Sequence, residues 1–256
     1  MRKFFTIASL FAMTLSACSD EVSKGEQKGE GRVTIDCVVT TTVDETRANV
    51  NCTTPTVDDF ALSIDGLSHT FNAEFATVTE FNESETYLKM GTYKASVHSG
   101  DVAEEGYDKA AFVGSEQFIV SPRKETAVEV TATIANALVK VEVTDAFKAY
   151  FVGGHNLKLT TAAGNEFDVT EQTEPIFIAP ASFTIGGTAT KQPNQSGAEG
   201  TVVSLPDYVN DNVAAQTFYT VKFDVENAGS ATLTITLNET LVESIEIEQE
   251  LNDNAK

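Results

Sequence analysis

The chain has 256 residues, 38 acidic against 17 basic side chains, and a formal charge of −21 at pH 7. This acidic excess argues against nucleic acid as a partner and against a polybasic membrane-binding face, because both require a basic surface. Hydrophobic residues make up 41% of the chain, which is ample for packed cores, and the length suits one large domain or two ordinary ones.

Residues 1–17 have the three parts of a secretion signal. Two basic residues precede the apolar run 4–13, which is too short to span a bilayer as a helix. The stretch Leu-Ser-Ala-Cys that ends at Cys18 resembles the lipobox of bacterial lipoproteins, in which the cysteine is acylated and the chain is cut just before it. We therefore expect this signal peptide to be removed and Cys18 to carry a lipid; an ordinary signal peptide with an unrelated cysteine is the alternative.

Residues 18–31 contain almost no apolar side chains, so they cannot bury enough surface to fold and are predicted to form a flexible tether. The acidic cluster 19–21 resembles the surface-export signal of Bacteroidota lipoproteins; a solvated acidic linker is the alternative. This resemblance predicts a lipid-anchored protein of the outer membrane, exposed at the cell surface. Loss of the signal peptide removes two basic residues and no acidic one, which makes the mature chain two charges more negative.

Apolar and polar residues then alternate at period two, the pattern of half-buried strands. Clear examples are 33–39 and 128–134. Clusters of Gly, Asn and Asp interrupt these runs at the spacing typical of an all-β sandwich. No segment shows a sustained helical stripe, and short helices are expected only at 146–151 and 211–215.

The two halves of the chain resemble each other. Segments 87–97 and 177–187 each contain an apolar pair, a turn with a small residue, an aromatic residue two places on, and then an extended run. The strand pair within 116–131 likewise compares with the pair within 216–236. These similarities indicate an internal duplication.

We therefore predict an all-β fold of two tandem transthyretin- or immunoglobulin-like β-sandwich modules, at 32–135 and 136–256. The boundary falls near Asn136 with no flexible linker, which implies a fairly fixed angle between the modules. Two long polar loops, 99–114 and 187–202, are either functional or disordered.

Two cysteines other than Cys18 are present, Cys37 and Cys52. A hairpin of 33–43 and 48–54, turning at Asp44-Glu45, would place the two thiols opposite each other. Export permits oxidation, so a disulfide is one prediction and two unpaired, half-buried cysteines are the other. Two thiols alone do not make a structural zinc site.

No catalytic motif is present. The three histidines are isolated, and the chain has no G-x-S-x-G, P-loop or Rossmann glycine pattern. Carboxylates are too numerous for a glycosidase pair to be singled out. The loops 101–108 and 207–212 offer oxygen ligands for calcium but lack EF-hand spacing. We predict a protein that is not an enzyme and has no cofactor and no metal.

Glycan recognition usually requires an exposed aromatic platform, and the chain has no tryptophan. Tyr107, Phe112 and Tyr208 are the candidate ligand contacts. The alternative is that these aromatics pack beneath their own loops.

Several short motifs occur in a defined order: Cys18-Ser19-Asp20-Glu21, Gly29-Glu30-Gly31, Thr46-Arg47-Ala48, Asp59-Phe60-Ala61-Leu62-Ser63-Ile64, Leu88-x-x-Gly91-x-Tyr93-x-Ala95 and Phe112-x-Gly114-x-x-x-Phe118-x-Val120. Their order resembles a family of two-module Bacteroidota surface lipoproteins known only as a domain of unknown function, itself similar to the fimbrillin superfamily of pilus and adhesion proteins. The resemblance spans 30–145. The C-terminal half resembles the family only in its general pattern.

This resemblance implies a non-enzymatic surface role in adhesion or fibre assembly, with other surface or pilus subunits as partners. Fimbrillins are processed after an arginine near the first strand, which frees a groove for a neighbour's strand; Arg47 is the candidate, and a solvated hairpin arginine is the alternative. No donor strand can be identified in the tail 243–256. The second hypothesis is a glycan- or ligand-binding surface lipoprotein of a nutrient-capture system. In both, the lipid supplies the attachment to the membrane.

Overall fold

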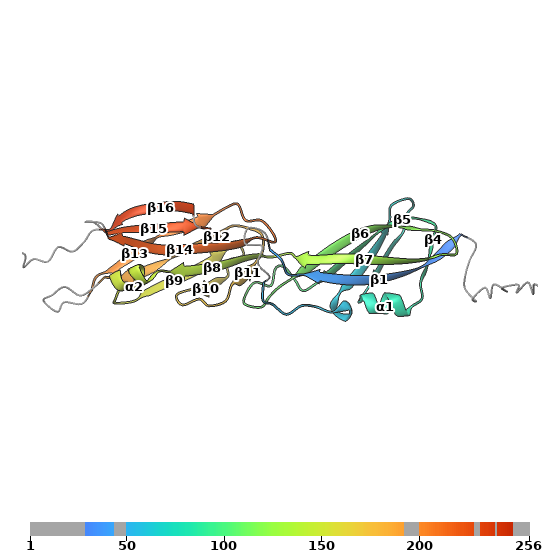
Figure 1. Ribbon diagram of the computed structural model, residues 1–256, viewed down its shortest axis with the longest axis horizontal. Helices are drawn as coiled ribbons and strands as arrows, with labels where there is room; N and C mark the ends of the chain where they lie inside the picture. Colours follow the sequence, from blue (N-terminus) through green and yellow to red (C-terminus); the bar gives the residue numbers. More distant parts are fainter. Residues whose placement is uncertain (1–28, 44–49, 192–199, 228–230, 239, 248–256) are drawn as a thin grey trace, which may run out of the picture.

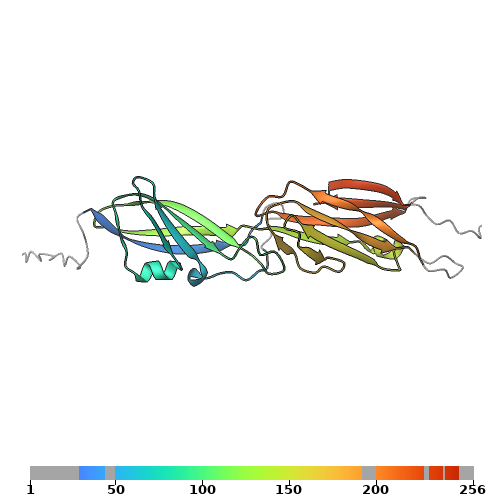
Figure 2. The ribbon, with the colours of Figure 1, turned by 180° about the vertical axis from the view of Figure 1, so that it is seen from behind.

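The computed structural model describes residues 29–43, 50–191, 200–227, 231–238 and 240–247. Strands make up most of this structure, which confirms the predicted all-β sandwich fold. The described helices are short: η1 (Val57–Asp59), α1 (Val78–Glu83) and α2 (Asp145–Tyr150). The strands form two modules that follow each other along one long axis (Figures 1 and 2). No described helix is long and apolar enough to cross a membrane.

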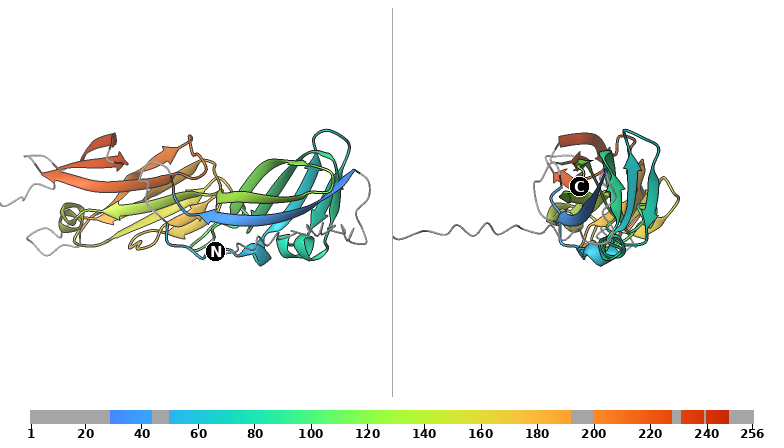
Figure 3. Two further views of the ribbon diagram at one scale, coloured as in Figure 1. Left: turned by 45° about the vertical axis from the view of Figure 1, so that its right-hand side comes forward. Right: turned by 90° about the vertical axis from the view of Figure 1, so that its right-hand side faces the viewer.

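The first module is a single seven-stranded sheet that bends into two layers. Across the sheet the strands are β3 (Asn72–Phe75), β2 (Ala61–Gly66), β5 (Gly91–Ser99), β6 (Phe112–Val120), β7 (Glu125–Ile134), β1 (Glu30–Thr40) and β4 (Tyr87–Lys89). β6 and β7 pair only at 112–114 with 132–134, and beyond this seam the sheet folds over itself (Figure 3). Gly114 lies at the seam, where a Cβ atom would approach the Thr131 carbonyl oxygen to 2.5 Å.

The second module is a sandwich of two separate sheets. One contains β10 (Glu166–Asp168), β9 (His155–Thr161), β12 (Phe183–Thr190) and β13 (Val202–Asn210). The other contains β11 (Ile176–Ile178), β8 (Ala137–Val143), β14 (Phe218–Asn227), β15 (Ala231–Leu237) and β16 (Thr240–Ile247). Helix α2 packs on β14.

The strand order shows the internal duplication directly. The layer β3-β2-β5-β6 corresponds to β10-β9-β12-β13, and β4-β1-β7 corresponds to β11-β8-β14. In the first module β1 pairs in parallel with β7, and in the second module β8 pairs in parallel with β14. Tyr93 and Phe183 occupy matching strands and are both buried. β6 and β7 therefore correspond to β13 and β14. The sequence comparison of 116–131 with 216–236 matched β6 and β7 to β14 and β15 instead, which is wrong by one strand.

The two apolar cores meet at the junction between the modules. The first core includes Tyr93, which stacks on Phe118 with ring centroids 5.6 Å apart. The second surrounds Phe147 and Phe223. Leu138 and Phe177 come from strands of the second module but belong to the first core cluster. The modules are therefore joined by packing as well as by the chain.

Candidate functional site

The loop 100–111, between β5 and β6, fastens the first module to the second. Glu105 accepts three hydrogen bonds from second-module residues: from the Thr161 hydroxyl at 2.5 Å, the Asn165 amide at 2.8 Å and the Ala179 backbone N–H at 3.0 Å. One carboxylate thus accepts hydrogen bonds from three separate residues of the second module. Charge-assisted hydrogen bonds of this kind are stronger than neutral ones. The sequence analysis predicted that loop 99–114 is either functional or disordered; these hydrogen bonds show that it joins the two modules.

The next residue of the loop extends a sheet of the second module. Gly106 and Phe177 exchange two backbone hydrogen bonds, each 2.9 Å long, in an isolated antiparallel bridge. Gly106 has φ = +147°, a conformation that L side chains rarely adopt. The bridge covers the edge of β11, which would otherwise present unpaired backbone groups.

A buried asparagine lies where the chain passes between the modules. Asn136 is 0% exposed; its side-chain oxygen accepts a hydrogen bond from Ala111 N at 2.6 Å, and its carbonyl accepts one from Gln216 N at 2.7 Å. The Gln216 side chain donates to the Thr42 carbonyl at 3.2 Å. Segments from both modules therefore converge at Asn136.

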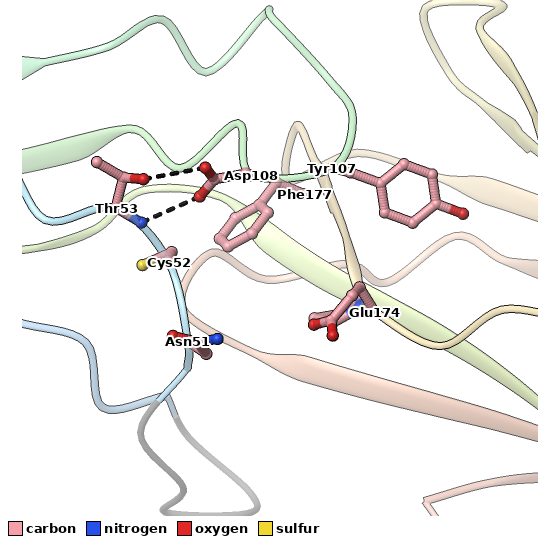
Figure 4. Close-up of a pocket in the computed structure, with 8 residues that line it drawn as sticks. Asn51, Cys52, Thr53, Tyr107, Asp108, Glu174 and Phe177 are labelled. Carbon is pink, nitrogen blue, oxygen red and sulfur yellow. Dashed lines mark hydrogen bonds between the residues drawn. The ribbon is translucent and has the colours of Figure 1, made fainter.

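An open groove of about 360 Å³ lies beside this junction (Figure 4). Three segments line it: 51–53 of the first module, 107–108 of the loop, and 174–177 of the second module. Phe177 lies between Asp108 and Glu174, and Asn51 and Cys52 lie on the side away from Tyr107 (Figure 4). No basic residue is among the lining residues, so the groove is acidic.

Hydrogen bonds hold one of the groove's two acidic side chains, that of Asp108, in place. Asp108 has φ = +51°, and its carboxylate accepts bonds from the Thr53 backbone N–H and hydroxyl, both at 3.0 Å. These bonds, the backbone one first, lower the pKa of Asp108 below its usual value. Burial, and then the Asp108 charge, raise the pKa of the Cys52 thiol. The groove therefore holds a fixed carboxylate beside a protonated thiol at neutral pH.

The three aromatic candidates have different environments. Tyr107 is 47% exposed and lines the groove. Phe112 is 1% exposed and Tyr208 is 8% exposed, because each is an inward-facing strand residue that packs into a module core. The expectation that Phe112 and Tyr208 contact a ligand is therefore wrong. Burial raises the pKa of Tyr107, and the nearby Asp168 charge raises it further.

The predicted cysteine hairpin is also wrong. β1 pairs in parallel with β7, a strand distant in the chain, and this places Cys37 opposite Val130. Cys37 and Cys52 are both free, half-buried thiols that pack against the first core. Burial, and then Asp36, raise the pKa of Cys37 to about 11.

Two other predicted residues, Cys18 and Arg47, lie outside the described residues, and their roles stay predictions. Within the described ranges, no group of three or more His, Cys, Asp or Glu side chains is placed to hold a metal ion. Sequence reasoning missed Glu105 and Glu174, and it gave Asn136 only as the module boundary, because no local pattern distinguishes these residues from the other polar residues of so acidic a chain.

The architecture and junction define a two-module β-sandwich protein whose modules are fixed to each other. The chain belongs to the family described as domain of unknown function DUF4493, which matches residues 29–253. This confirms the expected resemblance to a family of unknown function. No curated protein matches the sequence.

Several solved structures match this chain at low identity. A fimbrial assembly protein from Parabacteroides distasonis is 9% identical with a TM-score of 0.41, covering 87% of this chain and 100% of its own. A Bacteroides thetaiotaomicron protein, provisionally described as polysaccharide binding, is 10% identical with a TM-score of 0.40, covering 86% and 99%. A Bacteroides eggerthii protein, provisionally described as a cell adhesion protein, is 8% identical with a TM-score of 0.41, covering 84% and 97%.

Proposed function

We propose that this protein is a non-enzymatic, lipid-anchored surface protein with an adhesion or fimbria-type structural role. The observation that carries the proposal is the position of β1. This strand comes first in the described chain, yet it lies inside the sheet, between β7 and β4. The segment that connects it to the rest of the module contains Arg47. Cleavage there would leave β1 attached to its module only by non-covalent contacts.

Loss of β1 would open a long groove in the first module. β1 pairs with β7 over Arg32–Thr40 and with β4 over Glu30–Arg32. It also supplies Val33 and Ile35 to the core, where they are 2% and 3% exposed. Its removal would leave the facing edges of β7 and β4 unpaired and would expose the apolar groove between them. An added strand could pair with these edges and fill the groove.

The C-terminal strand is the donor that we propose for this groove. β16 lies at the end of the five-stranded sheet, and its described pairing is with β15 alone. An edge strand can leave its sheet at lower cost than an inner one, because it gives up one ladder of hydrogen bonds rather than two. A strand from one molecule that filled the β1 groove of the next would produce a head-to-tail fibre.

Arg47→Ala tests the proposal in the native bacterium, with Arg123→Ala, an exposed turn arginine, as the control. We expect the wild type and Arg123→Ala to yield a chain that begins at Ala48, identified by mass spectrometry, together with fibres in electron micrographs. Arg47→Ala should give neither. An intact wild-type chain without fibres would refute the fibre role, and fibres formed equally by Arg47→Ala would refute processing at this site.

Cleavage after Arg47 would separate Cys18 from the rest of the protein, so anchoring is tested with Cys18→Ser in the Arg47→Ala chain, which we expect to stay intact. We expect this change to abolish incorporation of labelled fatty acid and to release the protein from the membrane fraction. Retention in the outer membrane without lipid would contradict the proposed anchor.

Ligand capture is the second candidate function. The junction groove favours it, because this open concavity is lined by both modules and by the exposed residue Tyr107 together with Asp108 and Glu174. This candidate does not require the protein to polymerise.

A further inference from the structure

The first module exposes three large apolar side chains at its end away from the second module. Leu67, Met90 and Ile119 are 49%, 61% and 67% exposed. They belong to three neighbouring segments at the end where β1 begins, which are 66–71, 89–91 and 119–125 (Figure 1). We refer to these three segments together with Glu30 as the tip.

Backbone pairing gathers the apolar side chains of the tip around Thr92. Leu67 N donates to the Thr92 carbonyl at 2.8 Å, and Thr92 is the register partner of Ile119. Residues directly opposite each other on neighbouring strands point to the same face of a sheet, so Leu67 and Ile119 flank Thr92. Met90 lies two residues before Thr92, and its N–H donates to the Gly29 carbonyl at 2.7 Å. The three side chains therefore belong to one surface.

The turn that carries Leu67 has a fixed conformation. It is closed by a hydrogen bond from Gly66 N to the Phe71 carbonyl, 2.8 Å long. Its two rings, those of His69 and Phe71, pack on Tyr93 with centroids 5.2 and 5.6 Å away, and His69 Nε2 lies 3.1 Å from the Tyr93 hydroxyl. The same turn thus half-buries two rings and leaves Leu67 in solvent. This arrangement presents an apolar side chain without a further loss of conformational freedom on binding.

The tip also gathers basic side chains in a strongly acidic chain. Lys89 is the register partner of Glu30, and Arg123 N donates to the Glu30 carbonyl at 2.7 Å. Lys124 follows, and none of these three exposed basic residues forms an ion pair with another described residue. Glu30 and Glu125 are the acidic residues of the tip, so basic side chains outnumber acidic ones by one.

This local charge differs in sign from that of the whole chain, which is −21. The overall charge argued against a polybasic membrane-binding face. Charges more than about 8 Å away are largely screened at physiological ionic strength, so a surface that meets the tip responds mainly to the tip's own charge. The tip is therefore compatible with a negatively charged partner.

The position of the proposed lipid indicates which partner this is. Cys18 precedes Gly29 by 11 residues, a distance of at most about 40 Å even in a fully extended chain. Gly29 lies at the tip, where it accepts the hydrogen bond from Met90. An anchored chain therefore keeps the tip close to the bilayer surface. Exposed aliphatic side chains beside lysine and arginine are the combination that binds the boundary between lipid headgroups and acyl chains.

We propose that the tip docks on the anionic lipid surface to which the protein is anchored, with its three apolar side chains in the headgroup layer and its three basic side chains facing lipid phosphates. The inference rests on the proposed lipid anchor and concerns the intact chain, before any cleavage after Arg47. Because the modules follow each other along one long axis, docking at this end raises the second module away from the membrane (Figures 1 and 2).

Met90 provides the measurement, because it is the single methionine of residues 18–256. This chain is coupled through Cys18 to a maleimide lipid in vesicles of phosphatidylcholine mixed with phosphatidylglycerol. Coupling at pH 7 favours Cys18, since burial raises the pKa of both Cys37 and Cys52. Hydrogen peroxide converts exposed methionine to its sulfoxide, which mass spectrometry follows. We expect Met90 to be oxidised about fivefold more slowly on the vesicles than in the free chain, because docking buries its side chain.

Paired substitutions that leave Met90 in place test the apolar contact. Leu67→Ser/Ile119→Ser should bring the oxidation rate on vesicles to within about twofold of the free chain, because it removes two of the three inserted side chains. Val152→Ser/Val202→Ser is the matched control, since both valines are exposed on the second module, and it should stay protected. Unchanged unfolding midpoints establish that the variants are folded.

A second pair tests the charge. Lys89→Gln/Lys124→Gln should also remove most of the protection, because each lysine contributes to attraction by an anionic surface. Lys148→Gln/Lys222→Gln, at two exposed lysines of the second module, should not. Protection should be weaker on vesicles of phosphatidylcholine alone.

Three results would overturn the proposal. The first is a wild-type chain oxidised equally fast on vesicles and in solution, and the second is equal protection of the wild type and Leu67→Ser/Ile119→Ser. The third is equal protection on neutral and anionic vesicles. Protection in a concentrated solution without vesicles would instead assign the tip to a second copy of this chain. Because the anchor is supplied chemically, these failures say nothing against natural lipidation, which the fractionation of Cys18→Ser tests alone.

Discussion

Replacing Glu105 with alanine should loosen the connection between the modules without damaging either core. The change removes three hydrogen bonds, from Thr161, Asn165 and Ala179, at a junction that is only partly exposed. A net contribution of about 0.5–1.5 kcal/mol per bond, reduced where water replaces the carboxylate, gives a loss of about 2–3 kcal/mol in the free energy of unfolding. Glu105→Gln keeps one acceptor oxygen and should cost about 1 kcal/mol.

Urea unfolding measures the stability, and small-angle X-ray scattering measures the spread of angles between the modules. Glu104→Ala is the matched control, because the neighbouring Glu104 makes only an exposed ion pair with Lys109, at 3.0 Å, worth at most about 0.5 kcal/mol. We expect the scattering of Glu105→Ala to show a wider spread of angles between the modules than that of the wild type. The control should match the wild type. If Glu105→Ala differs from Glu104→Ala by less than about 0.5 kcal/mol and scatters like the wild type, the loop does not fasten the modules.

Three further predictions concern the modules themselves. Tyr93→Phe should lower the free energy of unfolding by about 1 kcal/mol, because it removes the bond from the Tyr93 hydroxyl to the Lys89 carbonyl, and an unchanged denaturation midpoint would contradict this. Thr144→Ala should cost about 1 kcal/mol by removing the cap that accepts from Phe147 N, measurable by thermal unfolding. Because the pKa of Cys37 is raised to about 11 in the folded chain, its stabilising effect is complete below pH 9 and is lost between pH 9 and 11; Cys37→Ala should flatten that part of the curve of stability against pH.

Regular patterns predicted the parts of the fold that depend on local sequence. Period-two alternation identified the strands, and the similarity of 87–97 to 177–187 identified a true structural repeat. The helix expected at 146–151 is confirmed as α2, one residue earlier, whereas 211–215 is not helical. Helix α1 was missed, although Thr77 and Glu80 form a capping pattern that could have revealed it.

The failures have a common cause, which is pairing between distant segments. The cysteine hairpin assumed that neighbouring strands pair, but β1 pairs with β7, about 90 residues later. Burial of Phe112 and Tyr208 likewise depends on which way each strand faces in the sandwich. The groove could not be predicted, because 51–53, 107–108 and 174–177 meet only when the two modules join.

The parallel pairing of β1 with β7 also determines how the first module would respond to tension. A pull between the tether and the second module enters at Glu30, where β1 begins, and leaves at Ile134, where β7 ends. In parallel strands these two points lie at opposite ends of the ladder, so the force shears all nine register positions together instead of opening them one by one. Forced unfolding is governed by the unfolding rate, and a sheared ladder must lose many bonds before it extends. The strand order therefore makes the first module a stiff mechanical element as long as β1 remains part of the chain.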